Sequence, residues 1–180
     1  MSRTFAFLRA INVGGHVVTM AALRGQFEAL GLKNVETFIA SGNVIFTTPA
    51  RVPATLPRRI EAHLHRALGY QVHTFLRSEA EVAAIANHRP FPPREIEAAG
   101  AFSVGLLAEP LTADRRKAAM ALRTDIDDFE VHGREIYWLC RKGQSDSKFN
   151  NNRFEKAIQG RATFRSMTTM ARLVARYVTP

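Results

Sequence analysis

The sequence predicts an α+β fold made of two ferredoxin-like (α/β-plait) βαββαβ halves packed together, with extra helices. Apolar runs of strand length and helical apolar stripes follow one another in the same order twice along the 180 residues. The Pro-rich stretch 90–93 separates the two series, and the composition, 46% hydrophobic and 23% charged, is that of an ordinary globular protein. We predict a first half over 1–77, a linking helix and Pro-rich connection over 78–100, and a second half with a C-terminal helix over 101–180.

In the first half, four apolar runs predict strands and two apolar stripes predict helices. The strands are expected at 4–11, 35–39, 44–46 and 72–76. The first helix begins after Thr19, a residue type that caps helices, and ends at Gly31. The second helix buries a stripe that includes Ile60 and Leu64 and stops at Gly69.

Between the halves, Ser78 and Glu81 have the spacing of a capping box and predict the start of a further helix. The stretch Pro90–Pro93 then predicts an extended, stiff connection, because proline fixes its own φ and disfavours helix in the residue before it.

The second half repeats this order of elements without repeating residue identities. Strands are expected at 102–107, 129–131, 136–139 and 162–165. One helix begins after Thr112, a second carries Phe154 and Ile158, and a last helix has an apolar stripe that includes Met170 and Tyr177.

The features that bear on compartment point to a cytoplasmic protein without a membrane partner. Cys140 is the only cysteine, which excludes an internal disulfide and leaves no Cys/His spacing for zinc. The apolar start 5–8 is interrupted by Arg9 and lacks a cleavage site of small residues, so no signal peptide is predicted. No run reaches the roughly 18 apolar residues of a membrane helix.

The formal net charge of +9 is unevenly distributed. Residues 1–77 contribute +6, residues 78–150 contribute −2 and residues 151–180 contribute +5. A basic surface favours partners that carry phosphate. The alternative is a compositional preference for arginine, which supplies 20 of the 25 basic residues.

Several short motifs are distributed along the chain: Leu8–Gly15, Leu23-Arg24, Ser41–Phe46, Glu135–Tyr137, Ser147-Lys148 and Thr163–Arg165. Together they resemble a bacterial family known as domain of unknown function 1697. The resemblance runs over nearly the whole chain and implies two α/β-plait subdomains, but no known reaction. This chain departs from the family pattern at Ala10, where the family usually has Gly, and at Ser166-Met167, where it has Asn-Trp.

Two loops of the first half carry candidate ligand-binding groups. Asn12, Gly14 and Gly15 join a buried strand to a helix, where backbone N–H groups could approach an anion. Ser41 and Asn43 offer a hydroxyl and an amide at a hairpin-like turn. In each case the residue types also suit an ordinary tight connection.

The second half carries candidate anion-binding groups near the starts of its last two helices. Lys148 could contact an anion as a point charge, while Ser147 could cap the following helix. Arg165, beside Ser166 and Thr168, forms a plausible fork for phosphate or carboxylate. The alternative for Arg165 is a surface residue paired with Glu155 or another acid.

The six histidines show no metal-ligand spacing, so no metal site is predicted, and the sequence leaves the cofactor unknown. We therefore rank three hypotheses. The first is a protein that binds a small molecule or anion, such as phosphate or a nucleotide, between the halves. Its site would be lined by Arg9, Asn12, Gly14, Gly15, Ser41, Asn43, Ser147, Lys148 and Arg165. The second is a sequence-tolerant nucleic-acid-binding protein. An enzyme of unrecognised mechanism ranks third, because no acid–base pair or nucleophile emerges.

Overall fold

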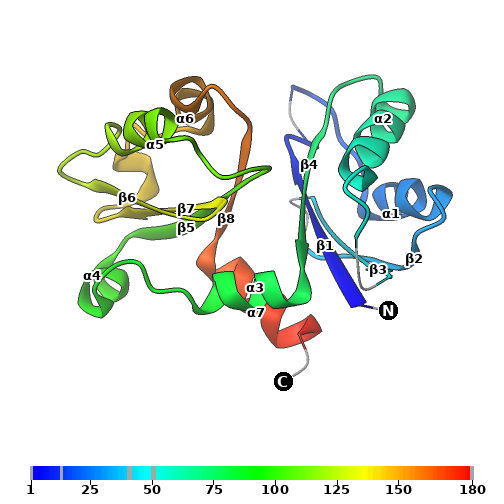
Figure 1. Ribbon diagram of the computed structural model, residues 1–180, viewed down its shortest axis with the longest axis horizontal. Coiled ribbons are helices and arrows are strands. Elements are labelled where there is room, and N and C mark those ends of the chain that lie inside the picture. Colours follow the sequence, from blue (N-terminus) through cyan, green and yellow to red (C-terminus); the bar gives the residue numbers. More distant parts are fainter. Residues whose placement is uncertain (1, 13, 40–41, 50–51, 179–180) are drawn as a thin grey trace. The chain divides into compact units, whose positions relative to one another are not determined.

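The structure, a computed structural model, describes residues 2–12, 14–39, 42–49 and 52–178. It contains two compact units, of which the first runs through Val82 and the second begins at Ala83. Each unit holds a four-stranded antiparallel sheet flanked by helices (Figure 1). The predicted α+β class with two βαββαβ halves is confirmed.

The first unit has the sheet order β2-β3-β1-β4. Its elements are β1 (Ser2–Arg9), α1 (Met20–Ala29), β2 (Lys33–Thr37), β3 (Asn43–Thr48), α2 (Leu56–Leu68) and β4 (His73–Ser78). Local chemistry sets the helix limits. Thr19 Oγ1 accepts the Ala22 N–H at 3.1 Å at the start of α1, and Gly69 ends α2 at φ 82°.

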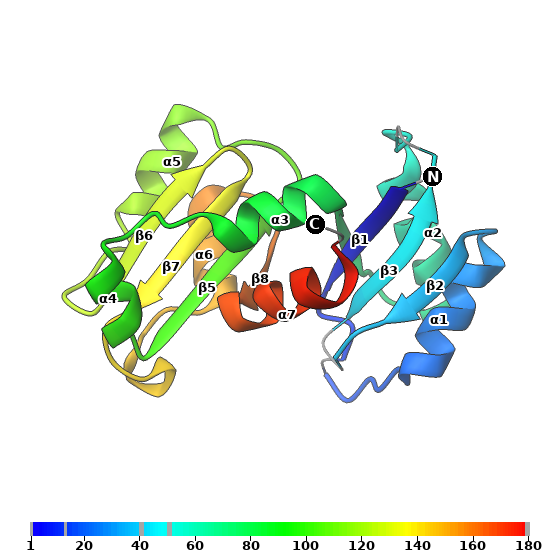
Figure 2. The same ribbon diagram turned by 90° about the horizontal axis from the view of Figure 1, so that it is seen from below.

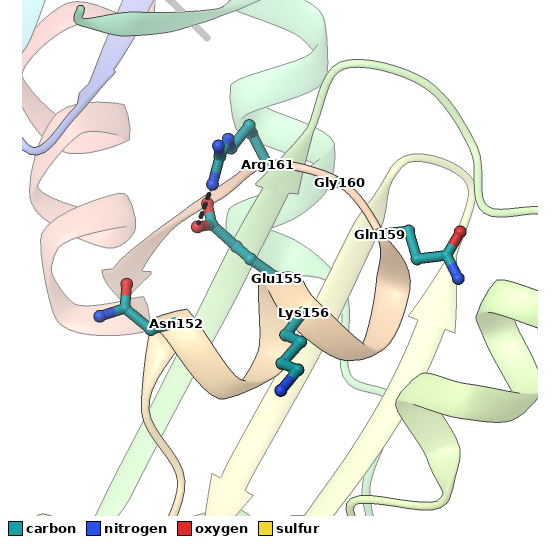
Figure 3. Close-up of a pocket in the computed structure, with 6 residues that line it drawn as sticks. All are labelled: Asn152, Glu155, Lys156, Gln159, Gly160 and Arg161. Carbon is teal, nitrogen blue, oxygen red and sulfur yellow. Dashed lines mark hydrogen bonds and ion pairs between the residues drawn. The ribbon is translucent and has the colours of Figure 1, made fainter.

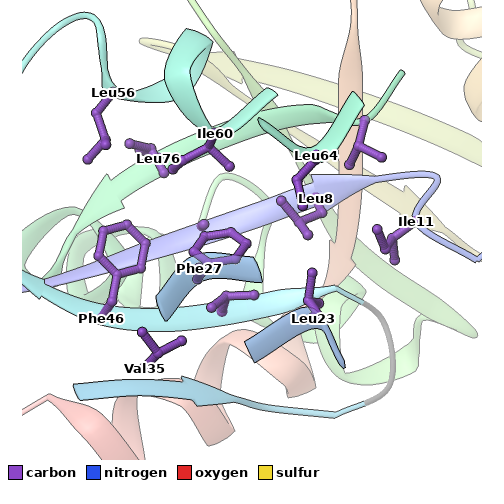
Figure 4. Close-up of a cluster of buried hydrophobic side chains, with 13 residues drawn as sticks. Leu8, Ile11, Leu23, Phe27, Val35, Phe46, Leu56, Ile60, Leu64 and Leu76 are labelled. Carbon is purple, nitrogen blue, oxygen red and sulfur yellow. The ribbon is translucent and has the colours of Figure 1, made fainter. Parts of the chain in front are cut away.

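The first core lies between α1, α2 and one face of this sheet (Figure 4). Phe27 of α1 and Phe46 of β3 pack in a tilted arrangement with ring centroids 5.7 Å apart, and Ile60 and Leu64 of α2 are fully buried. Packing of these apolar stripes supplies most of the stability of such short helices.

The second unit has the sheet order β6-β7-β5-β8. The division between the units, after Val82, falls within α3 (Glu79–Asn87). The separate linking segment expected over 78–100 stays a prediction. The other elements are α4 (Pro93–Ala98), β5 (Ala101–Leu107), α5 (Ala113–Met120), β6 (Asp127–His132), β7 (Glu135–Cys140), η1 (Gln144–Asp146), α6 (Asn151–Ile158), β8 (Ala162–Ser166) and α7 (Met167–Tyr177).

The second core fills the space between its sheet and the helices α5 and α6, with α7 on the opposite face (Figure 1). Phe149 is its aromatic centre, because its ring contacts those of Phe129, Trp138, Phe154 and Phe164. Offset and edge-on ring contacts of this kind add to the area that the rings bury.

Three local expectations need correction. The helix α4 was not expected, because the prolines predicted an extended connection. The helix begins at Pro93, since proline is tolerated at the first position of a helix. The strand expected at 35–39 lies at Lys33–Thr37, because Ile39 takes a left-handed φ of 57°. Ser147 does not cap α6; Asn150 does, with its Oδ1 accepting the Arg153 N–H at 2.9 Å.

Candidate functional site

The predicted site residues fall into two groups, one in each unit. Arg9, Asn12, Gly14, Gly15 and Asn43 belong to the first unit. Ser147, Lys148 and Arg165 belong to the second, and Ser41 lies outside the described residues. The predicted site that joins the two groups stays a prediction.

In the first unit, antiparallel pairing brings the end of β1 beside the start of β3. Phe7 pairs with Asn43, and the Leu8 N–H donates to the Gly42 carbonyl at 2.8 Å. The loop after β1 and the turn before β3 therefore lie at the same end of the sheet. Arg9, half-buried, pairs across the sheet with His73 of β4.

The two asparagines of this group hold their own loops. Asn12 Oδ1 accepts the Val18 N–H at 2.8 Å, and the buried Asn43 donates from Nδ2 to the Phe38 carbonyl at 2.9 Å. Side-chain amides commonly replace missing backbone partners in this way. These contacts support the alternative that both residues suit tight connections.

Three described residues in the loop after β1 have positive φ values. Gly14 and Gly15 have φ values of 62° and 85°, which favour glycine, and a Cβ at either position would meet nothing within 4 Å. Ala10 also takes a positive φ, 59°. Gly14 and Gly15 precede the N-cap Thr19 by several residues, so they do not form the first turn of α1.

In the second unit, Ser147 serves a buried carboxylate. Its Oγ donates to Asp127 Oδ1 at 2.7 Å, and the indole N–H of Trp138 donates to the same oxygen at 2.8 Å. Thr124 Oγ1 donates to Asp127 Oδ2 at 3.0 Å. Asp127 is 2% exposed, and these donors stabilise its charge in the core. Lys148, the next residue after Ser147, is exposed.

Cys140 lies next to this network, with its thiol in reach of the Gly143 carbonyl at 3.6 Å. Burial raises the pKa of the Cys140 thiol, and the nearby Asp127 adds to that effect. A thiol that resists ionisation is a poor nucleophile, so Cys140 is a packing residue here.

Arg165 is buried and not a surface residue. Its Nη1 donates to Thr163 Oγ1 at 2.8 Å and to the Phe164 carbonyl at 2.9 Å, while Glu155 pairs with Arg161 at 3.3 Å. Burial lowers the pKa of Arg165 to about 10, so its guanidinium remains charged at neutral pH.

The same arrangement occurs at the end of the first unit. Arg77 is 1% exposed, donates to the preceding Leu76 carbonyl at 2.9 Å, and is followed by Ser78, whose hydroxyl caps α3. Arg165 is likewise followed by Ser166, the N-cap of α7. A repeat of Thr-Phe and Arg-Ser, at 74–78 and 163–166, is the sequence signal for it.

A pocket of about 580 Å³ lies wholly within the second unit, where β5 begins and α7 starts. Its walls come from α3, α4, β5, η1, β8, α7 and the connections between them. Figure 2 shows α3, α4, β5, β8 and α7 from one side. The lining residues are Ala86, Arg89, Ile96, Ala99, Gly100, Ala101, Phe102, Ser103, Gln144, Ser166, Met167, Thr168 and Ala171. They include one basic residue and no acid.

Strand pairing assembles the polar side of this pocket. Ser103 of β5 lies opposite Ser166 of β8, although 63 positions separate them in the chain. Ser166 Oγ accepts the Thr169 N–H at 3.1 Å, which leaves the N–H groups of Met167 and Thr168 without partners inside the helix. Arg89, Ser103 and Gln144 were not predicted, because no short motif connects them.

The comparisons with known proteins bear on the whole chain. The sequence pattern of DUF1697, described as a protein of unknown function, matches residues 1–137. The chain belongs to the DUF1697 family. A solved structure, a conserved bacterial protein from Streptococcus pneumoniae named SP0830, is similar with a TM-score of 0.73 and 23% identity over 99% of each chain. This likeness supports the fold alone. The search of curated proteins finds no match.

The structure locates the positions where this chain departs from the DUF1697 pattern. Ala10 occupies a left-handed position that suits the glycine expected there. Ser166 and Met167 both line the pocket. Ser, like the expected Asn, is a favoured N-cap residue, whereas Met is smaller than the expected Trp.

The described residues also bear on metal sites and on membrane spans. Among them, no group of three or more His, Cys, Asp or Glu side chains is placed to hold a metal ion. In the same part of the chain, no helix has the length and apolar character needed to cross a membrane.

Proposed function

We propose that this DUF1697 protein binds a small organic anion, carrying a phosphate or carboxylate group, in the pocket at the start of α7. The observation that carries the proposal is the charge of the lining, in which Arg89 is the only ionised side chain. A concave site with one cation and no acid attracts an anion and repels a cation.

The donors in the pocket suit such a ligand. Arg89 Nη1 donates to the Ala86 and His88 carbonyls at 2.7 and 3.0 Å, and the other guanidinium N–H groups remain as donors. Thr168 lines the pocket at the second position of α7, and the 11-residue helix adds partial positive charge. The buried, charged Arg165 precedes that helix by two residues.

Other parts of the lining are apolar. They are formed by Ile96 of α4, Phe102 of β5 and Met167 of α7. Pockets that combine apolar walls with a few fixed polar groups favour ligands with an organic body. A nucleotide, a sugar phosphate or an aromatic acid has that combination, whereas inorganic phosphate uses only the polar side.

A thermal-shift screen tests the proposal with inorganic phosphate, nucleoside phosphates, sugar phosphates and aromatic carboxylates as probes. A probe at one hundred times its Kd adds about 2.7 kcal/mol to the stability of the folded state and raises the Tm. We expect Arg89→Ala to weaken its binding about 10- to 100-fold, since hydrogen bonds to charged groups contribute roughly 1.5–3 kcal/mol.

Two further variants sharpen this test. Thr168→Val removes a pocket hydroxyl without changing charge, and we expect it to weaken binding as well. Arg94→Ala removes an exposed arginine of α4 that does not line the pocket, and it should bind the probe as the wild type does. The proposal is wrong if no probe stabilises the protein, or if Arg89→Ala and Thr168→Val both retain wild-type affinity.

A further inference from the structure

The exposed surface of α5 and α6, the α5–α6 face, carries a concentration of basic side chains. The exposed residues are Arg115, Arg116 and Lys117 on α5 and Arg153 and Lys156 on α6. Both helices are fully described, and their only acids are Asp114 and Glu155. Glu155 is 4% exposed and is engaged by Arg161, so Asp114 alone offsets the five cations on these helices.

The two helices form one surface within the second unit. α5 and α6 pack against each other on the same face of the sheet (Figure 1). A hollow of about 560 Å³ at the end of α6 extends this surface with polar groups. Figure 3 shows its lining: Asn152, Glu155, Lys156, Gln159, Gly160 and Arg161. Lys148, a predicted anion contact, lies three residues before α6.

We propose that this α5–α6 face binds the phosphate backbone of duplex nucleic acid without sequence preference. Five exposed cations on adjoining helices can each neutralise a backbone phosphate and release its counterion. Recognition of this kind reads charge and not base identity.

The chemistry of the face selects duplex over single strands. Proteins that bind single strands usually stack bases on exposed aromatic rings. The one aromatic residue of the two helices, Phe154, is fully buried against Phe149 and Phe164. The face therefore offers cations to a backbone and no ring to a base.

The same face does not suit a membrane surface. Helices that lie on a bilayer pair their cations with an apolar face that enters the lipid. Among the described residues, the large hydrophobic side chains with high exposure are Val17 and Met20, and both belong to the first unit. The cations of α5 and α6 have no such anchor beside them.

The test is the salt dependence of binding between the intact protein and a mixed-sequence DNA duplex. With five phosphates neutralised, log Kobs should fall against log[salt] with a slope of about −4.5, a loss of about 500-fold between 50 and 200 mM salt. Arg115→Ala/Arg116→Ala/Lys117→Ala should make the slope shallower by about 2.7, and Arg153→Ala/Lys156→Ala by about 1.8.

A matched control separates the face from net charge. Arg58→Ala/Arg59→Ala/Arg66→Ala removes three exposed cations from α2 in the first unit and should leave the slope unchanged. Alanine favours helix, so all three variants are expected to keep their circular dichroism spectra. Absence of salt-sensitive binding, an equal loss in the control, or tighter binding to phosphatidylserine vesicles than to the duplex would each overturn the proposal.

Discussion

At the scale of single residues, the chain shows how position decides the role of a polar side chain. Ser147 and Arg165 belong to residue types that often bind ligands, and both are used inside the protein. Ser147 donates to the buried Asp127, and Arg165 donates to Thr163 and to the Phe164 carbonyl. Buried polar groups must find partners of this kind, because leaving one unpaired costs about 1–3 kcal/mol.

Ala10 offers a test of local backbone strain. Left-handed backbone costs a residue other than glycine about 1–2 kcal/mol, whereas glycine adopts this conformation without strain. Glycine, however, loses about 0.5–1 kcal/mol more conformational entropy on folding than alanine does. At φ 59°, Ala10→Gly should raise the free energy of unfolding by up to about 1 kcal/mol. Urea denaturation measures the change.

The matched control makes the same substitution where the backbone is helical. Ala62 is exposed within α2, so Ala62→Gly should lower the free energy of unfolding by about 1 kcal/mol. A loss of stability in Ala10→Gly as large as that in Ala62→Gly would show that the positive φ of Ala10 carries no strain.

At the scale of elements, each unit ends in the same junction between strand and helix. β4 ends with the buried Arg77 followed by the partly exposed Ser78, and β8 ends with the buried Arg165 followed by the exposed Ser166. In the first junction the predicted capping box is confirmed: the Ser78 N–H donates to Glu81 Oε2 at 2.7 Å, and the Glu81 N–H donates to Ser78 Oγ at 3.3 Å. The repeat therefore includes a helix after the sixth element of each half.

The residue that follows α3 makes stability depend on pH. His88 stacks on His132 of β6 with ring centroids 4.4 Å apart and lies 4.9 Å from the Tyr137 ring of β7. Burial, then the charge of His132, lowers the pKa of His88; Arg89 acts in the same direction and Glu135 opposes it. The folded protein thus binds a proton at His88 less readily than the unfolded chain does.

The sign of the pH effect follows from that difference. As pH falls through about 6.5, the unfolded chain takes up a proton at this position before the folded protein does, so the free energy of unfolding decreases. His88→Phe keeps a stacking ring without the titration and should flatten the urea midpoint between pH 7.5 and pH 5.5. His65→Phe, at an exposed position of α2, should retain the wild-type profile. An unchanged slope in His88→Phe would contradict the assignment.

At the scale of the whole molecule, two separate cores stabilise the chain. The first is built on α1, α2 and the sheet that contains β1, and the second on α5, α6 and the sheet that contains β7. Ile60 of α2 and Ile158 of α6 occupy corresponding places and are 0% and 1% exposed. Replacing either isoleucine with alanine therefore makes the same chemical change in its own core.

Each substitution should destabilise its own unit. Ile60→Ala and Ile158→Ala should each cost about 2–5 kcal/mol, through lost burial and the cavity left behind. Native-state hydrogen exchange should accelerate among the amides of the unit that carries the change, because opening follows cooperative structural units. Equal acceleration in both units by either variant would mean that the chain unfolds as one unit.

Short-range signals made most of the fold predictable. The caps at Thr19, Ser78 and Thr112, and the helix stop at Gly69, each depend on residues within a few positions. Apolar periodicity is also a short-range signal. It predicted the order of strands and helices, because it shows which face of an element is buried. α4 was not predicted, because a six-residue helix is too short to show a recognisable apolar periodicity.

The sequence by itself therefore determined the α+β class, the duplicated order of elements and the family. Only the tertiary structure decided which polar groups form hydrogen bonds inside the protein and which line a pocket. Burial of Arg165 and the pairing of Ser103 with Ser166 depend on contacts between distant segments. The pocket arises the same way, since its walls come from six elements that meet only when β5 pairs with β8 and α7 packs on them.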